Sequence, residues 1–488
     1  MVPKRPPHPN PLPRGARENE AVVSNLGGFL VGVAARRLAR NDTTGGSAIR
    51  RLESFRSKSS VPFSLFRFAF FLLTFAFFFV LAPILVFLPW FRVEAPVRLF
   101  SVMHGNDVSR TAVVSASHLL LASTEPLTDS HPRRLTAGVE GDGSAALLRL
   151  AVEETMVRGE IENRRGARIA STLSASKLGI DGLYKQCLAP DLQDKWPEAK
   201  TWFETLLPAP VPARVTGPAT TCIGACATGF LSLIRGVQMI EWDEADIVLT
   251  GAAEGTLNEL VLAGFDRMGV LSRTRPRPFD LRRDGFVPCE GAGVILLERE
   301  SDARADGRAF SARILGYAQR ANTTSAYGGT ADGEAIAELA LAALNSAGLE
   351  TSDLHYVHLH GTGTQINDAA EADALRLLFD SRGVFVPASS TKGLTGHCLG
   401  AAGAVELLLT IDALHRGLAP ATTGCETIDP SFRTDCILTR DFPLEGNRAL
   451  LLSYGFGGPM TALVVEAVEG RTNRPAFRAR APEQSGRR

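Results

Sequence analysis

Residues 224–229 read Gly-Ala-Cys-Ala-Thr-Gly and lead into a largely apolar stretch that ends near Ile240. Apolar residues recur there every three to four positions, which predicts a helix that begins at Cys226. Residues 247–250, Ile-Val-Leu-Thr, follow as a short apolar run typical of a buried strand. A helix followed by a buried strand is a unit of an α/β fold, and here a cysteine stands at the helix start.

The same alternation continues on both sides of this unit. Apolar periodicity predicts helices over residues 145–156, 334–347, 369–379 and 400–414. Apolar runs predict strands over residues 113–117, 167–172, 293–298, 356–359, 448–453 and 461–466. Strands alternating with helices predict a layered α/β fold. We see no repeat of short period in the sequence.

Composition excludes several functional classes. The chain has 488 residues, of which 45% are hydrophobic and 21% charged, as in a globular protein with a sizeable core. Lys+Arg and Asp+Glu each total 52, so no charge bias suggests a nucleic-acid partner. The seven cysteines are irregularly spaced and include no Cys-x-x-Cys pair, so we expect neither a disulfide framework nor a metal site. This pattern favours a reducing, cytoplasmic location.

The two ends of the chain differ from the rest. Residues 1–66 are basic and proline-rich, which predicts disorder, and we expect the same of residues 469–488. Residues 67–92 are hydrophobic and contain an uncharged run over 68–91 that is long enough to span a bilayer. Three interpretations stay open for this run: a membrane anchor, a buried core segment, or residues upstream of a true start at Met103.

Cys226 is the first candidate for chemistry. A thiol attacks well only as a thiolate, and a helix N-terminus favours that form through its partial positive charge. The small residues Ala225, Ala227 and Gly229 leave room for an incoming acyl chain. The alternative is a buried, inert cysteine, which is the usual state of a free cysteine in a protein core.

Two histidines follow in unusual surroundings. His360 begins His-Gly-Thr-Gly-Thr at the end of a predicted strand, where α/β proteins often bind ligands. His397 ends residues 390–397, Ser-Thr-Lys-Gly-Leu-Thr-Gly-His. Two neutral imidazoles that donate to one oxygen could stabilise an enolate or oxyanion. Lys392 could orient His397 or set its protonation state. The alternatives are core histidines and a solvated lysine.

Residues 453–458, Ser-Tyr-Gly-Phe-Gly-Gly, contain too many glycines for an ordinary strand and predict a tight turn near a site. Phe456 within this turn could line or gate an acyl tunnel. The alternative is an ordinary core phenylalanine.

Taken together, these segments resemble the β-ketoacyl-acyl carrier protein synthases, the condensing enzymes of the thiolase-like superfamily, over residues 143–467. The resemblance implies a layered αβαβα fold of two similar halves. These would be residues 103–300, with the cysteine, and residues 301–468, with both histidines. It further implies a homodimer whose partner is an acyl carrier protein.

The resemblance also assigns roles to residues. Its catalytic residues match Cys226, His360, Lys392 and His397. Its substrate-binding residues match Thr362 and Thr364, which contact the phosphopantetheine arm, and Phe456, a gate. Glu406 matches a residue that supports the site structurally. No metal or redox cofactor is implied, because the substrates are carried on phosphopantetheine.

Three departures from the family pattern stand out. Tyr454 occupies a position that is usually phenylalanine, and Pro459-Met460 replaces the usual Thr-Asn. The front half is also short, because about forty residues after Met103 replace the family's long first segment. The oxyanion hole implied by the resemblance uses the backbone N–H groups of Cys226 and Phe456, which such side-chain changes leave in place.

These observations predict decarboxylative Claisen condensation of an acyl thioester with malonyl-acyl carrier protein, in fatty-acid or polyketide elongation. One alternative is a non-catalytic partner subunit of the chain-length-factor type, suggested by the short front half. Another is a membrane-anchored synthase, suggested by residues 68–91. The acyl chain length and the pathway stay open.

Overall fold

A computed structural model describes the chain. The residues that it describes are 111–122, 127–135, 143–164, 166–180, 184, 212–255, 257–322, 332–468 and 476–479. They belong to one compact unit, Arg98–Arg488. The predictions for residues 1–66 and 67–92, and for nearly all of 469–488, lie outside the described residues. Within the described ranges, every helix is too short or too polar to cross a bilayer.

The main sheet consists of two halves with the same strand order. The first half contains β1 (Ala112–Leu121), β2 (Ile169–Ser174), β3 (Ala219–Thr220), β4 (Ile247–Glu254) and β5 (Gly291–Arg299). The second contains β6 (Ala312–Ala321), β7 (Tyr356–His358), β8 (Ala388–Ser389), β11 (Arg448–Tyr454) and β12 (Pro459–Ala467). Across the sheet the strands run β3-β2-β4-β5-β1 and then β6-β12-β11-β7-β8.

Read from its outer edge, each half therefore orders its strands third, second, fourth, fifth, first. The directions agree as well: the outer three strands are parallel, and the next two pair antiparallel. The halves join through a short antiparallel pairing of β1 with β6, at Val113 with Arg313 and Val114 with Ala312. The strand β13 (Ala476–Ala479) pairs in parallel with β1. These four residues therefore differ from the disorder predicted for residues 469–488, because their backbone pairs with the sheet.

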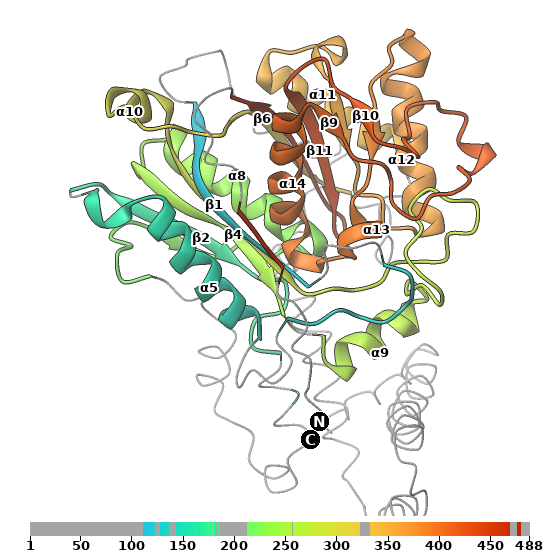
Figure 1. Ribbon diagram of the computed structural model, residues 1–488, viewed down its shortest axis with the longest axis horizontal. Helices are drawn as coiled ribbons and strands as arrows, with labels where there is room; N and C mark the ends of the chain where they lie inside the picture. Colours follow the sequence, from blue (N-terminus) through green and yellow to red (C-terminus); the bar gives the residue numbers. More distant parts are fainter. Residues whose placement is uncertain are drawn as a thin grey trace, which may run out of the picture. The chain divides into compact units, whose positions relative to one another are not determined.

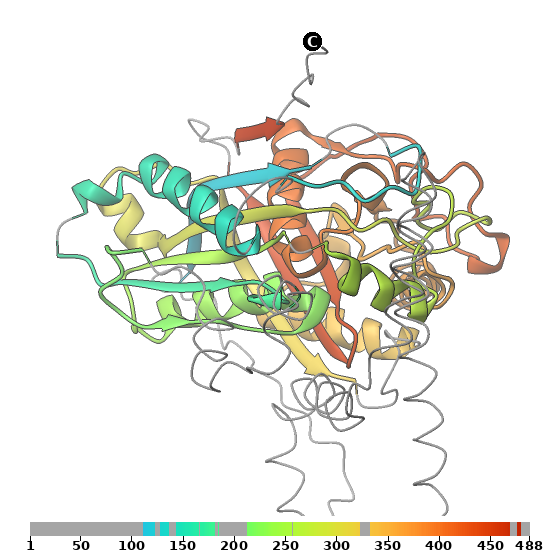
Figure 2. The ribbon, with the colours of Figure 1, turned by 90° about the horizontal axis from the view of Figure 1, so that it is seen from below.

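Helices cover both faces of these strands (Figure 1). The long helices are α5 (Gly143–Arg158), α8 (Thr228–Glu241), α11 (Gly333–Ala347), α12 (Gln365–Leu378) and α14 (Ala402–Arg416). Helix α5 packs on one face of the first half, and α8 packs on the other face, as the turned view in Figure 2 also shows. Helix α14 packs against α8 and against strands of both halves, while α11 and α12 cover the second half.

The burial pattern of the strands explains these layers. Leu297 of β5 and Leu451 of β11 face a central core that they share with α8 and α14. The neighbouring Leu296 faces α5, and the neighbouring Leu450 faces α11 and α12. Because successive side chains of a strand point to opposite faces, continuously apolar strands need a helical layer on each side. The result is the predicted αβαβα arrangement.

The two central helices approach each other at paired glycines. A Cβ atom at Gly229 of α8 would lie 2.7 Å from the backbone N of Ala404. A Cβ atom at Gly403 of α14 would lie 2.7 Å from the ring of Phe230. Both glycines are therefore required by packing, and they set the distance between the starts of the two helices.

The remaining regular elements are short. They include α9 (Glu259–Met268), α10 (Glu300–Ala305), α13 (Lys392–Thr395), β9 (Leu418–Ala419) and β10 (Phe442–Pro443). Of these, α9 and α13 lie next to the residues predicted to form the site.

Candidate active site

Cys226 lies in a single 3₁₀ turn, Ala225–Ala227, directly before α8. Ala225 has a φ of 49°, a left-handed conformation that is costly for a residue with a Cβ atom. Ser453 of β11 donates a hydrogen bond to the carbonyl oxygen of Cys226 at 3.3 Å. The second half contains the same device, because Leu399 has a φ of 48° at the start of the 3₁₀ turn Leu399–Ala401 before α14.

The thiol of Cys226 is buried, with an exposed fraction of 5%. Burial raises its pKa to about 11, and the positive charges of Lys177 and Lys392 act in the opposite direction. The sequence led us to expect that the helix start would lower this pKa. That expectation was wrong in direction, because desolvation of the thiolate outweighs the nearby positive charges. The resting site therefore holds a thiol whose proton must leave during attack.

The two candidate histidines meet in the structure. The ring centroids of His360 and His397 are 5.5 Å apart, and the rings are nearly perpendicular. Both side chains are buried. Burial and the charge of Lys392 hold the pKa of each imidazole well below its usual range. Both rings are therefore neutral near pH 7, as the sequence analysis expected.

Backbone contacts fix the positions of these rings. The N–H of His360 donates to Glu371 at 2.7 Å, and the N–H of His397 donates to the carbonyl of Val287 at 2.8 Å. The ring of His360 also packs edge-on against Tyr454, with centroids 5.3 Å apart. The two histidines thus come from separate loops, and a backbone hydrogen bond fixes each of them in place.

Lys392 forms a buried ion pair with Glu406 of α14. Its ammonium also donates to the carbonyl oxygen of His360 and lies 3.5 Å from Nδ1 of the same residue. The sequence predicts that Lys392 orients His397 or sets its protonation state. Its hydrogen-bond contacts are with His360, while its charge lowers the pKa of both imidazoles.

Helix α12 holds the His-Gly-Thr-Gly-Thr loop through carboxylates that the sequence analysis did not single out. Glu371 accepts hydrogen bonds from the N–H groups of His360 and Gly361, both at 2.7 Å. Asp368 accepts from the N–H of Gly363 at 3.1 Å. Burial raises the pKa of Glu371 to about 8. Acidic residues spaced three apart on one helical face were the available signal.

The two threonines of this loop lie side by side, with their Oγ1 atoms 3.0 Å apart. Thr364 is the N-cap of α12 and accepts from the N–H of Asn367 at 3.4 Å. Its hydroxyl thus has a structural role that the sequence analysis did not assign. Thr362 is nearly buried.

Phe456 is half-buried and packs against an apolar cluster beside the site. Its ring centroid lies 6.4 Å from that of Phe265, and Phe265 meets Phe286 edge-on at 5.4 Å. Phe286 in turn contacts the ring of His397 at 4.9 Å. The aromatic cluster thus extends from Phe456 to one of the two imidazoles.

Pro459 does not disrupt the glycine turn. The N–H of Gly455 donates to the carbonyl of Pro459 at 2.8 Å, and the N–H of Gly458 donates to Gly455 at 3.1 Å. Gly457 and Gly458 have φ values of 86° and 100°, which favour glycine. The turn lies against the nucleophile loop, because a Cβ atom at Gly455 would lie 2.3 Å from the carbonyl oxygen of Gly224.

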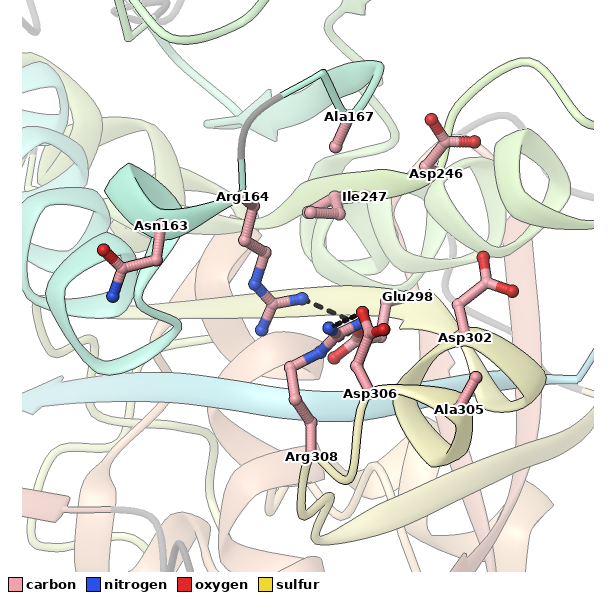
Figure 3. A pocket seen from close by; sticks show the side chains of 10 residues that line it. All are labelled: Asn163, Arg164, Ala167, Asp246, Ile247, Glu298, Asp302, Ala305, Asp306 and Arg308. Carbon is pink, nitrogen blue, oxygen red and sulfur yellow. Dashed lines mark hydrogen bonds and ion pairs between the residues drawn. The ribbon is translucent and has the colours of Figure 1, made fainter.

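A cavity of about 410 Å³ lies at the opposite end of β4 from this site (Figure 3). Arg164 and Arg308 both point to Glu298 there, at 2.8 Å and 3.0 Å. The two guanidinium groups and the carboxylate pair with one another, so we interpret the lining of this cavity as a structural ion cluster. Among the described residues, no cluster of His, Cys, Asp and Glu suits a metal ion.

Comparison with known proteins identifies the family of the chain. Residues 136–303 match the model of the β-ketoacyl synthase N-terminal domain, and residues 311–426 match that of the C-terminal domain. A mitochondrial 3-oxoacyl-[acyl-carrier-protein] synthase of Arabidopsis thaliana is 36% identical over 52% of this chain and 57% of its own length. The alignment thus spans less than two thirds of that relative.

Two bacterial relatives are covered further. The actinorhodin polyketide putative β-ketoacyl synthase 1 of Streptomyces coelicolor is 32% identical over 62% of this chain and 69% of its own length. The 3-oxoacyl-[acyl-carrier-protein] synthase 2 of Staphylococcus aureus is 32% identical over 60% of this chain and 74% of its own length.

Solved structures share the fold. A β-ketoacyl synthase from Burkholderia phymatum has a TM-score of 0.64 at 22% identity, over 74% of this chain and all of its own. A type II polyketide ketosynthase, solved with its acyl-carrier protein, has a TM-score of 0.63 at 24% identity over the same shares. The chain belongs to the β-ketoacyl synthase family.

Proposed function

We propose that this chain is a β-ketoacyl-acyl carrier protein synthase, which extends an acyl chain by decarboxylative condensation with a malonyl thioester. One observation carries the proposal. Two neutral, buried imidazoles, His360 and His397, lie within 5.5 Å of each other beside the buried pair of Lys392 and Glu406. Cys226, at the strained turn before α8, is the acyl acceptor. The names of the relatives, 3-oxoacyl synthases and polyketide synthases, support the same reaction.

The first step loads the enzyme. The sulfur of Cys226 attacks the carbonyl carbon of an acyl thioester, and a neutral imidazole relays the thiol proton towards the leaving group without remaining protonated. The carbon–sulfur bond to the carrier's phosphopantetheine then breaks, and the leaving sulfur takes the proton. The backbone N–H groups of Cys226 and Phe456 stabilise the tetrahedral oxyanion. A thiol whose pKa is raised to about 11 makes this proton acceptor necessary.

The second step forms the carbon–carbon bond. His360 and His397 donate to the thioester oxygen of a malonyl carrier, the carboxylate leaves as CO₂, and an enolate forms. The enolate carbon attacks the acyl carbon on Cys226, whose bond to sulfur breaks. The thiolate of Cys226 takes up a proton from solvent, and the product is a 3-oxoacyl thioester. Neutral imidazoles suit this step because each can donate its N–H to the enolate oxygen.

Thr362 and Thr364 bind the phosphopantetheine arm, and Phe456 gates the acyl chamber. An acyl carrier protein delivers both substrates, and no metal or redox cofactor takes part. We place the enzyme in the cytoplasm, since its described cysteines are all free. The family resemblance implies that it forms a homodimer. The alternative of a non-catalytic partner subunit is not favoured, because the thiol, both imidazoles and the lysine are all present.

The test is condensation by the purified full chain with malonyl-carrier and a panel of acyl-carriers, with products read by mass spectrometry. We expect Cys226→Ser to abolish acyl loading and 3-oxoacyl product. Cys222→Ser is the matched control, because Cys222 is a free cysteine four residues earlier. Condensation that persists in Cys226→Ser, or that is lost equally in Cys222→Ser, would refute this assignment.

A further inference from the structure

Lys177 lies in the turn after β2, in a polar cluster next to the site. Its Nζ atom lies 2.6 Å from Oγ of Ser176 and 3.4 Å from Oε2 of Glu254. Glu254 ends β4 and is fully buried. Its Oε2 atom also accepts from the N–H of Gly400 at 3.0 Å. Glu254 thus connects the ammonium of Lys177 to the turn that follows His397.

The same ammonium faces the aromatic cluster of the site. Its Nζ atom lies 5.7 Å from the ring centroid of Phe265, the residue that contacts both Phe286 and Phe456. Phe286 contacts the ring of His397. The side chain of Lys177 has an exposed fraction of 22%, so it is accessible from one side. A positive charge thus stands at the wall of an otherwise apolar cluster.

Lys177 acts electrostatically on the reacting groups, and its ammonium can donate a further hydrogen bond. Its charge lowers the pKa of the Cys226 thiol, ahead of Lys392, and it lowers the pKa of His397 as well. Its ammonium donates a hydrogen bond to Oγ of Ser176 and forms an ion pair with Glu254. Because an ammonium has three N–H groups and this side chain is partly exposed, it can also donate to a bound molecule.

A cation at this place has a consequence for substrate choice. A saturated acyl chain beside it would desolvate the ammonium and return no hydrogen bond. A substrate oxygen would accept a charge-assisted hydrogen bond. We propose that Lys177 binds an oxygen of the substrate next to Cys226, so that the enzyme favours oxygen-bearing substrates; this inference rests on the proposed function. The oxygen belongs either to a 3-oxo group of the acyl chain or to the malonyl carboxylate.

Two assays distinguish these sources. The first measures loading of Cys226 in competition between octanoyl-carrier and 3-oxo-octanoyl-carrier, by mass spectrometry of the intact protein. The second measures the KM and kcat of CO₂ release from malonyl-carrier. Lys177→Met removes the charge but keeps a long side chain, and Lys177→Arg keeps the charge. Arg416→Met is the control, because it removes a cation paired with an acid at the far end of α14.

We expect Lys177→Met to lower the loading preference for the 3-oxo chain, or to raise the malonyl KM, by roughly 10-fold. The first result assigns the oxygen to the acyl chain, and the second assigns it to malonate. Lys177→Arg should recover most of the effect, and Arg416→Met should show none. If Lys177→Met does not fold, Lys177→Met combined with Glu254→Gln removes both charges and takes its place.

An unchanged preference together with an unchanged malonyl KM would overturn the inference. So would an equal loss with both acyl chains and an unchanged malonyl KM, because that pattern reports a structural defect. Failure of the proposed function looks different: the unaltered enzyme itself would neither load Cys226 nor release CO₂.

Discussion

Lys392 and Glu406 sit directly behind His360, and both side chains are almost fully buried. A buried ammonium is costly unless a carboxylate compensates it, so Glu406 makes Lys392 tolerable at this depth. Burial, together with the charge of Lys392, keeps protons off both imidazoles. The site therefore retains two neutral hydrogen-bond donors at a pH where an exposed histidine would begin to protonate.

We predict that the pH profile of CO₂ release from malonyl-carrier shows no acid limb from histidine protonation between pH 8 and pH 6. For an unperturbed imidazole with a pKa of about 6.5, the neutral fraction would fall roughly fourfold between pH 8 and pH 6. His360 and His397 lose much less, because the pKa of each lies well below 6.5. An acid limb with an apparent pKa near 6.5 in the pH profile would contradict this prediction.

Melting temperatures at each pH are the control for that profile. The folded-state pKa of each histidine is lower than its unfolded value, so the unfolded chain binds more protons below pH 6.5. Acidification through these groups therefore favours unfolding. Glu371 and Glu406 act oppositely, because burial raises the pKa of each carboxyl, that of Glu371 to about 8. At these two carboxyls the folded chain binds more protons than the unfolded one above about pH 4.5, so acidification through them favours folding.

Much of the site was predictable from sequence at the residue level, and the reason is local. Cys226, His360 and His397 stand among glycines and threonines whose pattern is visible without a structure. Lys177 and Glu254 carry no such signal, because they are far apart in the chain and meet only through the fold. The buried state of Cys226, which decides the direction of its pKa shift, also depends on tertiary packing.

Among the elements, strands with continuous apolar runs were predicted well, and strands with mixed or short sequences were not. Strand β4 was expected over residues 247–250 and extends to Glu254. Strand β6 was missed because Arg313, Gln319 and Arg320 interrupt its pattern. Arg313 is accommodated by pairing with Glu300 at 2.8 Å. Strands β3 and β8 have two residues each, too few for any periodicity.

The contact of α8 with α14 makes a prediction at this scale. We expect Gly229→Ala to destabilise the protein by about 1–3 kcal/mol, because the added methyl group would overlap the backbone at Ala404. Gly264→Ala is the matched control. Gly264 lies inside the helix α9 with no atom near its Cβ position, so this change should stabilise by about 0.5–1 kcal/mol. Urea unfolding measures both, and equal effects would contradict the close approach.

For the molecule as a whole, the duplicated strand order is the feature that sequence did not reveal. We found no short-period repeat, and the two halves were expected only from a family resemblance. The order and the directions of the strands repeat because the same layers are built twice. The side chains that fill the layers differ between the halves, so the repetition is visible in the strand topology and in the turns before α8 and α14 rather than in the sequence.

The two halves share a single central core, since the same apolar cluster contains residues of α8, of α14 and of strands from both halves of the main sheet. We predict that they unfold together. Far-UV circular dichroism and near-UV circular dichroism should report one coincident transition in urea. A fragment that ends at residue 303 should fail to fold alone, because its side of the core would be open. Two separated transitions in Arg98–Arg488 would contradict this prediction.

The duplicated 3₁₀ turn limits how many acyl groups the chain can carry. Gly400 occupies in the second half the position that Cys226 has in the first, one residue after a left-handed backbone. A Cβ atom at Gly400 would lie 2.7 Å from the carboxylate of Glu254, so no side chain fits there. The second turn therefore has no room for a nucleophilic side chain, and the N–H of Gly400 donates a hydrogen bond to Glu254. Of the two equivalent turns, only the first can therefore carry an acyl group, which limits loading at these turns to one group per chain.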